Sequence, residues 1–334
     1  MKSIHKNNLD TYLLGSQFFG TGGGLPLEKH KKIFLQALEK KYDLSFTNIH
    51  SFESHDRLAS IYGVGDPSKA QENFEELTLQ SLAQFERLSG IKVKGIIPGE
   101  IGAEGLAFLS GSILDLPVVD SDLVGGRAAP EIQLDTFTVH AKPLTPLLGF
   151  AENKKSIFLE GNFSAEEIEN ILRTFFEKNG SSGMLVGYPI FAGEYAKIGM
   201  LQTLSETLQM GEILADKKLS SFVSDQNGKL FENEIIEEVH LESGGGFLQG
   251  SIQTKNYEIE VKNENMALIQ KRNRKDLAQV PEIIMVLSAE GTPLHNADIA
   301  KYRGKEVQIV VLPAKGYWNV HENQLAWETL RRQE

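Results

Sequence analysis

The sequence predicts an α/β protein of two domains, in which alternating strands and helices are followed by a β-rich half. Its 334 residues exceed the usual size of a single domain. Short apolar runs alternate with segments of helical periodicity up to about residue 155, and strand and turn patterns dominate from Phe222 onward. We therefore expect an α/β domain over residues 1–160, and a helical connector with a β-rich domain over residues 161–334.

The first domain is expected to contain a largely parallel sheet, because its strands and helices alternate along the chain. Apolar residues recur at helical spacing in four segments, and four short apolar runs bounded by turn residues predict strands. The expected helices are Asp10–Phe19, Leu27–Leu38, Glu72–Leu88 and Ile101–Leu109. The expected strands are Leu44–Ile49, Leu58–Val64, Val93–Ile97 and Leu116–Val119.

The second domain is expected to begin with helices and to continue as strands. Ser164, followed by Glu166 and Glu167, indicates a capped helix start. Gly183–Gly193 is expected to be a loop, either a connector between helices or a cover for a cleft, and Tyr195–Leu214 is expected to be a helix. A hairpin signal at Asp225–Gly228 precedes strand patterns that predict a small barrel or sandwich: Ser251–Thr254, Tyr257–Val261, Met266–Gln270, Ile283–Leu287 and Val307–Leu312.

The composition is that of an acidic globular protein. Hydrophobic residues make up 41% and charged residues 24% of the chain, and the net charge is −11. This charge disfavours nucleic acids and anionic membrane surfaces as partners. No apolar run approaches the roughly 18 residues that a membrane-spanning helix requires. Because there are no cysteines and no signal-peptide pattern, we expect a cytoplasmic protein without disulfides or thiol chemistry.

A glycine-rich turn near the N-terminus is the first candidate ligand site. Gly20, Thr21, Gly22, Gly23 and Gly24 lie between two predicted helices. Consecutive glycines leave backbone N–H groups unshielded and allow positive φ, so the amides can converge on one acceptor beside a helix N-terminus. We expect the turn to bind a carboxylate, a phosphate or a polarised carbonyl, and a flexible connector is the alternative. Neither the dinucleotide fingerprint nor the P-loop is present, so no nucleotide is expected.

Two glutamates follow the predicted strand at Val93–Ile97. Ligands collect at the carboxyl edge of the strands in open α/β sheets, which makes this position favourable for a site. Glu100 and Glu104 are four residues apart and would share one face of the predicted helix. Like charges held together raise a pKa or recruit a cation. The alternative is a solvated acidic helix start, stabilised by the helix dipole.

The segment after the last predicted strand of the first domain is the third candidate site. Asp120 and Asp122 stand at the strand end, and Arg127 and Glu131 follow a double-glycine turn. Two carboxylates at this spacing can bind a hard cation, or one can act as a base while Arg127 keeps it ionised. Arg127 could also hold a substrate carboxylate. An Asp helix cap and a structural Asp–Arg pair form the alternative.

Two common kinds of catalytic centre are not indicated by local motifs. The eight histidines form neither a His-x-x-x-His nor a His-x-His ligand pair. No Gly-x-Ser-x-Gly segment is present, so a serine triad of the hydrolase type has no support. The metal ligands, if a metal is used, cannot be named from the sequence.

Four stretches together resemble a known family. They are the Gly-Thr-Gly-Gly-Gly-x-Pro turn, Pro-Val-Val-Asp-Ser-Asp at 117–122, Gly-Arg-Ala-x-Pro-Glu-Ile-Gln at 126–133, and the C-terminal segments at 281–284, 291–293 and 307–314. This pattern is similar to that of the S-methyl-thiohydantoin desulfurase family. The resemblance implies a three-layer α/β sandwich followed by a β-barrel-like domain. It also implies a role in hydantoin-ring breakdown, in which water replaces sulfur at the ring carbon between two nitrogens.

These observations lead to a hydrolase of a small cyclic amide or thioimidate ring as the main hypothesis. The glycine amides would stabilise the developing negative charge. Asp120 or Asp122 would activate water, alone or through a divalent ion of unknown identity. Arg127 would orient the substrate, and Glu131 or Glu100 would steer the base or protonate the leaving group.

Two other functions use the same residues differently. The chain could be a non-catalytic metabolite-binding partner or subunit of a hydantoinase-type enzyme, with the glycine turn and Arg127 holding a ligand that is not converted. It could also be a scaffold that forms a homo-oligomer through its β-rich domain. Metal content and ligand turnover distinguish the first alternative from the hydrolase, and a monomer in solution would argue against the second.

Overall fold

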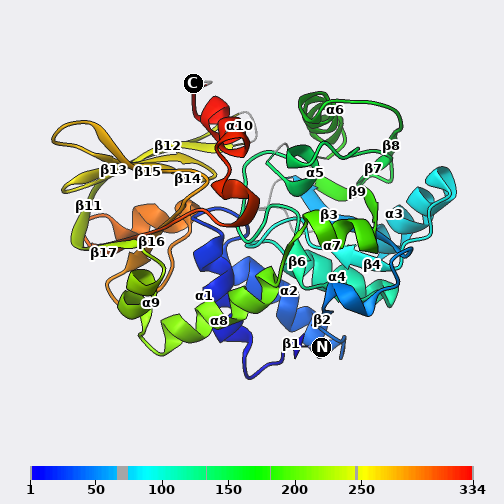
Figure 1. Cartoon of the computed structure of the whole chain (residues 1–334), viewed down its shortest axis with the longest axis horizontal. Coiled ribbons are helices and arrows are strands. Elements are labelled where there is room, and N and C mark those ends of the chain that lie inside the picture. Colours follow the sequence, from blue (N-terminus) through cyan, green and yellow to red (C-terminus); the bar gives the residue numbers. More distant parts are fainter. Residues whose placement is uncertain (1, 66–73, 133, 181, 245–246, 333–334) are drawn as a thin grey trace. The chain divides into compact units, whose positions relative to one another are not determined.

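The fold was analysed in a computed structural model that describes residues 2–65, 74–132, 134–180, 182–244 and 247–332 (Figure 1). The chain forms two compact units, and each is built from discontinuous segments. The first unit comprises Met1–Leu9, His30–Gly126 and Glu131–Ser205. The second comprises Asp10–Lys29, Arg127–Pro130 and Glu206–Glu334.

An eight-stranded mixed sheet forms the centre of the first unit, in the order β1-β2-β5-β4-β3-β9-β7-β8. The neighbours β2, β5, β4 and β3 are parallel, whereas β1 and the β9, β7 and β8 side pair antiparallel. The prediction of a largely parallel sheet is therefore confirmed for only half of it. The strands are β1 Lys2–Ser3, β2 Ser45–Thr47, β3 Arg57–Gly65, β4 Gly95–Ile97, β5 Val118–Val119, β7 Leu147–Ala151, β8 Ser156–Leu159 and β9 Ser182–Phe191.

Helices cover both faces of this sheet, which gives the three layers that the family resemblance implied. Alternate residues of β3 point to opposite sides, so Leu58 joins one apolar cluster and Ala59 and Ile61 join the other. The helices α3 (Phe74–Ser89) and α4 (Gly105–Leu114) pack against the Ala59 side. On the Leu58 side lie α5 (Thr136–Val139), α6 (Ala165–Lys178) and α7 (Ala192–Ile198).

The second unit contains an antiparallel seven-stranded sheet in the order β15-β14-β13-β12-β11-β17-β16. The long strand β11 pairs with β17 along its first half and with β12 along its second, and its register shifts in both pairings. Such irregularities bend a strand and let a sheet curl. The curl brings β14 toward β16, where Asn265 Nδ2 donates to the Ile284 carbonyl at 3.0 Å. This agrees with the expected barrel-like domain. The strands are β11 Lys229–Gly244, β12 Phe247–Thr254, β13 Tyr257–Lys262, β14 Glu264–Gln270, β15 Lys275–Gln279, β16 Ile283–Ser288 and β17 Glu306–Leu312.

The remaining helices include the predicted N-terminal pair. The chain forms α1 (Leu9–Phe19), α2 (Leu27–Glu39), α8 (Thr203–Ala215), α9 (Leu219–Asp225) and α10 (His321–Arg332), with the short 3-10 helices η1 (Ile49–Ser51), η2 (Asn296–Tyr302) and η3 (Gly316–Asn319). The capped helix start at Ser164 is confirmed, because Ser164 and Glu167 form a reciprocal capping box. Within the described ranges, none of the helices is both long and apolar enough to cross a bilayer.

Three local predictions are wrong. Gly183–Gly193 is not a loop, because most of it forms β9 between β3 and β7. The predicted helix Tyr195–Leu214 is interrupted at Gly199 by β10 (Met200–Leu201), which pairs with β6 (Ser121–Asp122). The turn at Asp225–Gly228 ends α9 and leads into β11, so it closes a helix and not a hairpin.

Candidate functional site

Asp120 follows β5 and caps the first turn of α8 through Ser205, a residue of its own unit. Its carboxylate accepts hydrogen bonds from the backbone N–H of Ser205 at 2.9 Å and from the Ser205 hydroxyl. Ser205 is the third residue of α8, so the charge of Asp120 lies at the positive end of that helix. This arrangement corresponds to the structural alternative considered for Asp120, because both carboxylate oxygens accept a hydrogen bond from Ser205.

Asp122 is buried and organises the loop that follows it. Its two carboxylate oxygens accept the backbone N–H groups of Val124, Gly125 and Gly126 at 3.0, 2.8 and 2.7 Å. Burial nevertheless raises the pKa of Asp122 to about 7, because these three bonds and one from Thr203 only partly offset the lost hydration. The carboxylate therefore titrates near neutral pH while its oxygens are engaged by its own loop.

Tyr195 connects this loop to the interior of the first unit. Its hydroxyl donates to the backbone carbonyl of Asp122 at 3.1 Å and lies 2.8 Å from the Ser121 hydroxyl, which itself reaches the Met200 carbonyl at 2.6 Å. Burial raises the pKa of Tyr195, so the phenol stays protonated and acts as a donor. The β6–β10 pair is thus stabilised by side chains as well as by backbone bonds.

Glu104 and Glu100 do not share a helix face, because α4 begins only at Gly105. Glu104 is buried, and its Oε2 accepts the backbone N–H of Gly102 at 2.7 Å. The same oxygen lies 4.0 Å from Nε2 of the buried His30. Glu100 is only half-buried and precedes the turn that leads into α4. The two glutamates therefore belong to different environments, which corrects the expected pairing.

A group of buried titratable side chains near Glu100 was not identified from the sequence. Asp135 caps α5, with Oδ1 accepting the backbone N–H of Thr138 at 2.8 Å. Burial raises the pKa of Asp135 to about 7, and hydrogen bonding from Thr138, Phe137 and Tyr188 offsets only part of this rise. Its Oδ2 receives no hydrogen bond of standard geometry. Asp135 is thus a carboxyl group whose protonation changes near neutral pH and whose second oxygen lies near the Tyr188 hydroxyl without a hydrogen bond of standard geometry.

Two tyrosines accompany Asp135. The rings of Tyr62 on β3 and Tyr188 on β9 lie 6.4 Å apart, and burial raises the pKa of both phenols. Tyr188 has a φ of 57° where the β3–β9 register shifts. A tyrosine in the left-handed region is strained, and strained residues beside bulges concentrate at functional sites. Phe137 packs edge-on against Tyr188 at 5.2 Å and helps to hold it there.

Three half-buried glutamates interact electrostatically with this group or with one another. Glu100 and Glu169 raise the pKa of Tyr62 by repulsion, and Glu131 does the same to Glu169. The pKa of Glu169 is raised chiefly by burial, although Arg173 pairs with its Oε1 at 2.6 Å. We call Tyr62, Asp135, Tyr188, Glu100, Glu131 and Glu169 the acid–tyrosine cluster. It unites two predicted site residues, Glu100 and Glu131, with four that a local motif did not reveal.

The glycine turn belongs to the second unit, where it packs closely against polar residues. Gly22 has a φ of 90°, and a Cβ there would lie 2.4 Å from the Asn296 amide nitrogen. A Cβ on Gly23 would lie 2.0 Å from Oε1 of Glu264, so any other residue would require the carboxylate or the turn to move. A carboxylate of the protein itself therefore lies against the turn whose amides were expected to bind an anion. The anion-binding role of Gly20–Gly24 stays a prediction.

Arg127 is also part of the second unit and is buried. Its Nη1 donates to the carbonyls of Pro281 and Glu282 at 2.7 and 3.1 Å, and its Nε donates to the Ala128 carbonyl at 3.0 Å. The guanidinium carbon lies 4.3 Å from the ring centre of Trp327 on α10. These contacts give Arg127 a structural role, and its predicted contact with substrate stays a prediction.

A metal centre is not evident from the arrangement of ligands. Among the residues that the structure describes, no group of three or more His, Asp or Glu side chains is placed to hold a metal ion. The single divalent ion considered for Asp120 and Asp122 therefore stays a prediction without a ligand set.

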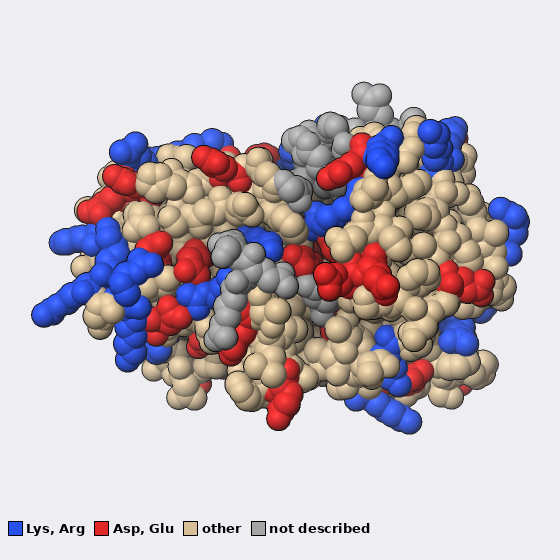
Figure 2. Space-filling model, turned by 90° about the horizontal axis from the view of Figure 1, so that it is seen from above, with Lys and Arg blue, Asp and Glu red and all other residues tan. Residues whose placement is uncertain are grey.

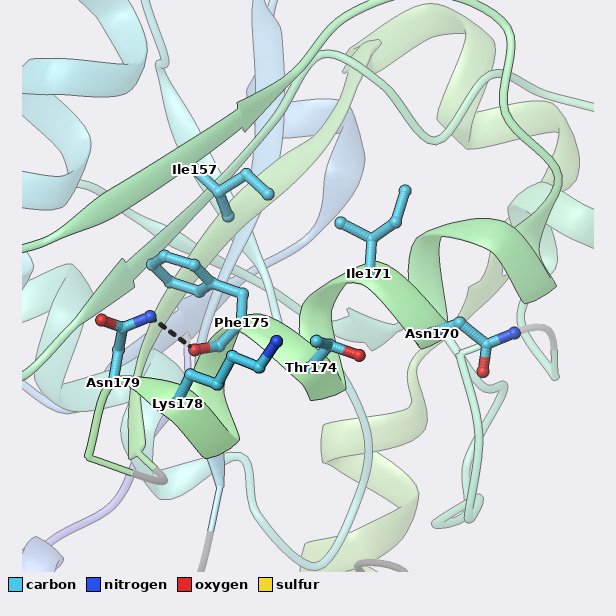
Figure 3. A pocket seen from close by; sticks show the side chains of 7 residues that line it. All are labelled: Ile157, Asn170, Ile171, Thr174, Phe175, Lys178 and Asn179. Atoms are coloured by element: carbon cyan, nitrogen blue, oxygen red, sulfur yellow. Dashed lines mark hydrogen bonds between the residues drawn. The ribbon is translucent and has the colours of Figure 1, made fainter.

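A hollow on the surface of the first unit lies on α6. The hollow has a volume of about 520 Å³. Seven residues line it, one from β8, five from α6 and the one that follows α6: Ile157, Asn170, Ile171, Thr174, Phe175, Lys178 and Asn179 (Figure 3). None of the seven is a carboxylate or a histidine, so this hollow lacks groups for acid–base chemistry. On the face drawn in Figure 2, basic and acidic side chains are interspersed, and several acidic side chains lie side by side.

Comparison with known families assigns both parts of the chain. The N-terminal domain of S-Me-THD-like proteins matches residues 7–161, and the C-terminal domain of the same proteins matches residues 164–327. The chain belongs to the S-Me-THD-like family. The resemblance to S-methyl-thiohydantoin desulfurases is thereby confirmed at the level of the family.

The fold of this S-Me-THD-like protein is shared by a solved structure. A crystal structure of a protein from Chromobacterium violaceum matches it with a TM-score of 0.81 and 20% sequence identity, over 100% of this chain and 97% of that one. At this identity the likeness concerns the fold alone. No curated protein matches the sequence.

The two family domains and the two compact units divide the chain differently. The family domains meet between residues 161 and 164. The compact units instead assign Asp10–Lys29 and Arg127–Pro130, both within the N-terminal family domain, to the second unit. The glycine turn and Arg127 are therefore N-terminal in sequence but belong to the unit that contains the curled sheet. The domain boundary at residue 160 stays a prediction.

Proposed function

We propose that this S-Me-THD-like protein is a hydrolase of a small cyclic amide or thioimidate ring, such as a hydantoin or a thiohydantoin. The observation that carries the proposal is the acid–tyrosine cluster, in which Asp135 has a pKa of about 7 beside two protonated phenols. The family supports a hydantoin-related substrate. The cluster supplies the acid–base groups that such a substrate requires.

Asp135 has the properties of a general base for water. A base works best when its pKa lies near the working pH, because it is then deprotonated and still basic. Burial provides this pKa, and Oδ2 accepts no hydrogen bond of standard geometry, although the Tyr188 hydroxyl interacts with the carboxyl group. Asp122 has a similar pKa, but three loop amides occupy its oxygens. The geometry therefore favours Asp135 over Asp120 and Asp122 for this role.

Tyr62 and Tyr188 would stabilise the charge that develops on the ring. Attack of water on a ring carbon places negative charge on the attached nitrogen or oxygen, and a phenol O–H can donate to that atom. Both phenols have raised pKa values, so they remain protonated at neutral pH. The half-buried Glu100, Glu131 and Glu169 would accept hydrogen bonds from ring N–H groups and so orient the ring.

For a thioimidate substrate, the reaction balances without an oxidant or a reductant. Water adds its oxygen to the ring carbon, and Asp135 takes one of its protons. The ring nitrogen gains one proton, the carbon–sulfur bond breaks, the sulfur leaves with the other proton as a thiol, and the ring carbon becomes an amide carbonyl. For a cyclic amide, the carbon–nitrogen bond breaks instead and the ring opens.

Thiol release tests this proposal directly. The chain contains no cysteine, so a thiol reagent has no background from the protein. We expect S-methyl-thiohydantoins to release thiol, and Asp135→Asn to lower kcat/KM by about 100-fold or more. The wild-type kcat/KM should rise as the pH increases through about 7, where Asp135 loses its proton. Asp43→Asn serves as the control, because Asp43 is an exposed residue just before β2 in the same unit.

Two results would contradict the assignment. If Asp135→Asn is folded and retains the wild-type rate, Asp135 is not the base. If the protein binds the rings tightly but releases neither thiol nor an opened ring, the metabolite-binding alternative replaces the hydrolase. Tyr188→Phe separates the role of the phenol from the packing of its ring, because it removes only the hydroxyl.

A further inference from the structure

A closed set of hydrogen bonds surrounds the glycine turn in the second unit. The backbone N–H of Asn265 donates to the Thr21 carbonyl at 2.8 Å, and the backbone N–H of Asn296 donates to the Gly22 carbonyl at 2.8 Å. Nδ2 of Asn296 donates to Oδ1 of Asn265 at 3.1 Å, which closes the ring. Thr21, Asn265 and Asn296 are therefore held in one fixed arrangement.

Two buried oxygens in this arrangement have no hydrogen-bond partner. They are Oγ1 of Thr21 and Oδ1 of Asn296, in residues that are 0% and 2% exposed. A buried polar atom without a partner costs roughly 1–3 kcal/mol, so such atoms usually indicate a bound group. Two of them beside one turn point to a shared partner.

The side-chain donors of Asn265, Asn296 and His295 are already used. Nδ2 of Asn296 also donates to the Asn263 carbonyl at 2.8 Å, and Nδ2 of Asn265 donates to the Ile284 carbonyl at 3.0 Å. His295 accepts the backbone N–H of Ala297 at Nδ1, so its Nε2 carries the proton that faces the Gly24 carbonyl at 3.3 Å. Burial lowers the pKa of His295, which keeps it neutral. Oδ1 of Asn296 can only accept, so it requires a cation or another donor, and the Thr21 hydroxyl oxygen can bind the same cation.

A buried carboxylate supplies negative charge at the same place. Glu264 is 2% exposed and precedes Asn265, and a Cβ on Gly23 would lie 2.0 Å from its Oε1. A carboxylate, an amide oxygen and a hydroxyl are the hard oxygen ligands that alkali and alkaline-earth ions prefer. With no nitrogen or sulfur ligand in this set, a transition metal is disfavoured.

We infer that the turn Gly20–Gly24 and the side chains of Thr21, Glu264 and Asn296 form a binding site for an alkali or alkaline-earth cation. The bound ion would fasten the turn to β14 and to the start of η2. Every residue of this site belongs to the second unit, whereas the acid–tyrosine cluster belongs to the first. The site is therefore independent of the proposed hydrolase and can fail or hold without it.

Thermal unfolding in defined salts tests the site without any activity. The full chain is dialysed against a chelator and then melted in NaCl, KCl, MgCl₂, CaCl₂ or choline chloride at equal ionic strength. We expect at least one metal cation to raise Tm by about 3 °C or more over choline. Equal Tm values in all five salts would overturn the inference and leave a water molecule as the partner of the two oxygens.

Two variants and one control make the test specific. Glu264→Gln and Thr21→Val should each abolish most of the cation-dependent shift. Glu234→Gln should keep it, because Glu234 is equally buried in the same unit and its oxygens are occupied by Thr254 and Asn256. If Thr21→Val instead raises Tm and leaves the cation response unchanged, its hydroxyl was only an unpaired group and the site is refuted.

Discussion

The imidazole of His30 accepts the backbone N–H of Gly105 at 3.0 Å through Nε2. This bond joins α2 to the first turn of α4, and it requires an unprotonated Nε2. Burial lowers the pKa of His30, although electrostatic attraction to Glu104, 4.0 Å away, acts in the opposite direction. A single buried histidine therefore links the protonation state of the protein to the start of a helix that covers the sheet.

The pH dependence of stability follows from the sign of this shift. Because the pKa of His30 is lower in the folded chain than its ordinary value of 6.5, the unfolded chain binds the proton first. The contribution of His30 to stability is present above pH 6.5 and is lost as the pH falls toward its folded pKa. We expect wild type to exceed His30→Gln in unfolding free energy at pH 7.5, and this gap to narrow at pH 5.5, in urea titrations of both proteins.

Measuring the gap between the two proteins isolates His30 from other titrating groups. Asp122 and Asp135 have raised pKa values of about 7, so their contribution to stability changes with pH in the opposite direction. It is fully present below their unfolded value of 3.8 and is lost as the pH rises through about 7. These groups are the same in wild type and in His30→Gln, so their effect cancels. A gap that stays constant from pH 7.5 to 5.5 would rule out the role of His30.

Replacement of Asp122 by Asn should destabilise the first unit. The carboxylate accepts three loop amides, whereas an asparagine side chain offers one acceptor oxygen and brings an NH₂ group against an N–H. We expect a loss of about 2–4 kcal/mol in urea unfolding, since buried donors are left unpaired. Asp43→Asn, at an exposed position just before β2, should change stability by less than about 0.5 kcal/mol. Equal stability of Asp122→Asn and wild type would show that the loop does not depend on this carboxylate.

Much of the fold could be predicted because its signals are local. The helices α1 and α2, the capped start of α6 and most strands of the curled sheet follow apolar periodicity and capping residues. The strand β9 was missed because Gly183, Gly187 and Pro189 are typical of loops, and only pairing with β3 and β7 makes the segment a strand. Tertiary context overrides propensity at such a position.

The turn at Asp225–Gly228 was misassigned because two structures use the same residues. Asn227 has a φ of 56° and the backbone N–H of Gly228 returns to the Val223 carbonyl at 2.8 Å. An Asn-Gly pair with positive φ closes a hairpin or ends a helix equally well. The choice depends on α9, whose short length gave little periodicity to recognise.

The candidate site was predictable only where residues stand at a strand end. Glu100 and Glu131 were selected for that reason, and both join the acid–tyrosine cluster. Asp135 was not selected, because an aspartate before a short helix is an ordinary cap and its raised pKa comes from burial by the assembled unit. Tyr62 and Tyr188 are likewise brought together by strand pairing, which a single sequence does not display.

Alanine at Gly23 should destabilise the second unit. Its Cβ would lie 2.0 Å from the buried Glu264 carboxyl, so the side chain or the turn must move. We expect a loss of about 1–3 kcal/mol in unfolding free energy, the usual range for an overpacked interior. Gly244→Ala is the matched control, because a Cβ there would meet nothing within 4 Å. When combined with Glu264→Ala, the cost of Gly23→Ala should fall, whereas the cost of Gly244→Ala should not change. Equal costs for both alanines would contradict the close packing of the turn.

Lysine at Arg127 should loosen the C-terminal helix although it preserves the charge. The planar guanidinium reaches the Pro281 and Glu282 carbonyls while it stacks on Trp327, and a lysine ammonium can do only one of these. The chain has two tryptophans, Trp318 and Trp327, both buried and 5.5 Å apart. Their fluorescence therefore reports this region alone.

We expect Arg127→Lys to shift the emission to longer wavelength and to lower the free energy of unfolding by about 2–4 kcal/mol, since buried carbonyls lose their donors. Arg173→Lys, which alters a partly exposed ion pair with Glu169, should leave the emission unchanged. If Arg127→Lys also leaves it unchanged, Arg127 does not hold α10, and a direct role with a ligand becomes the better explanation for its burial.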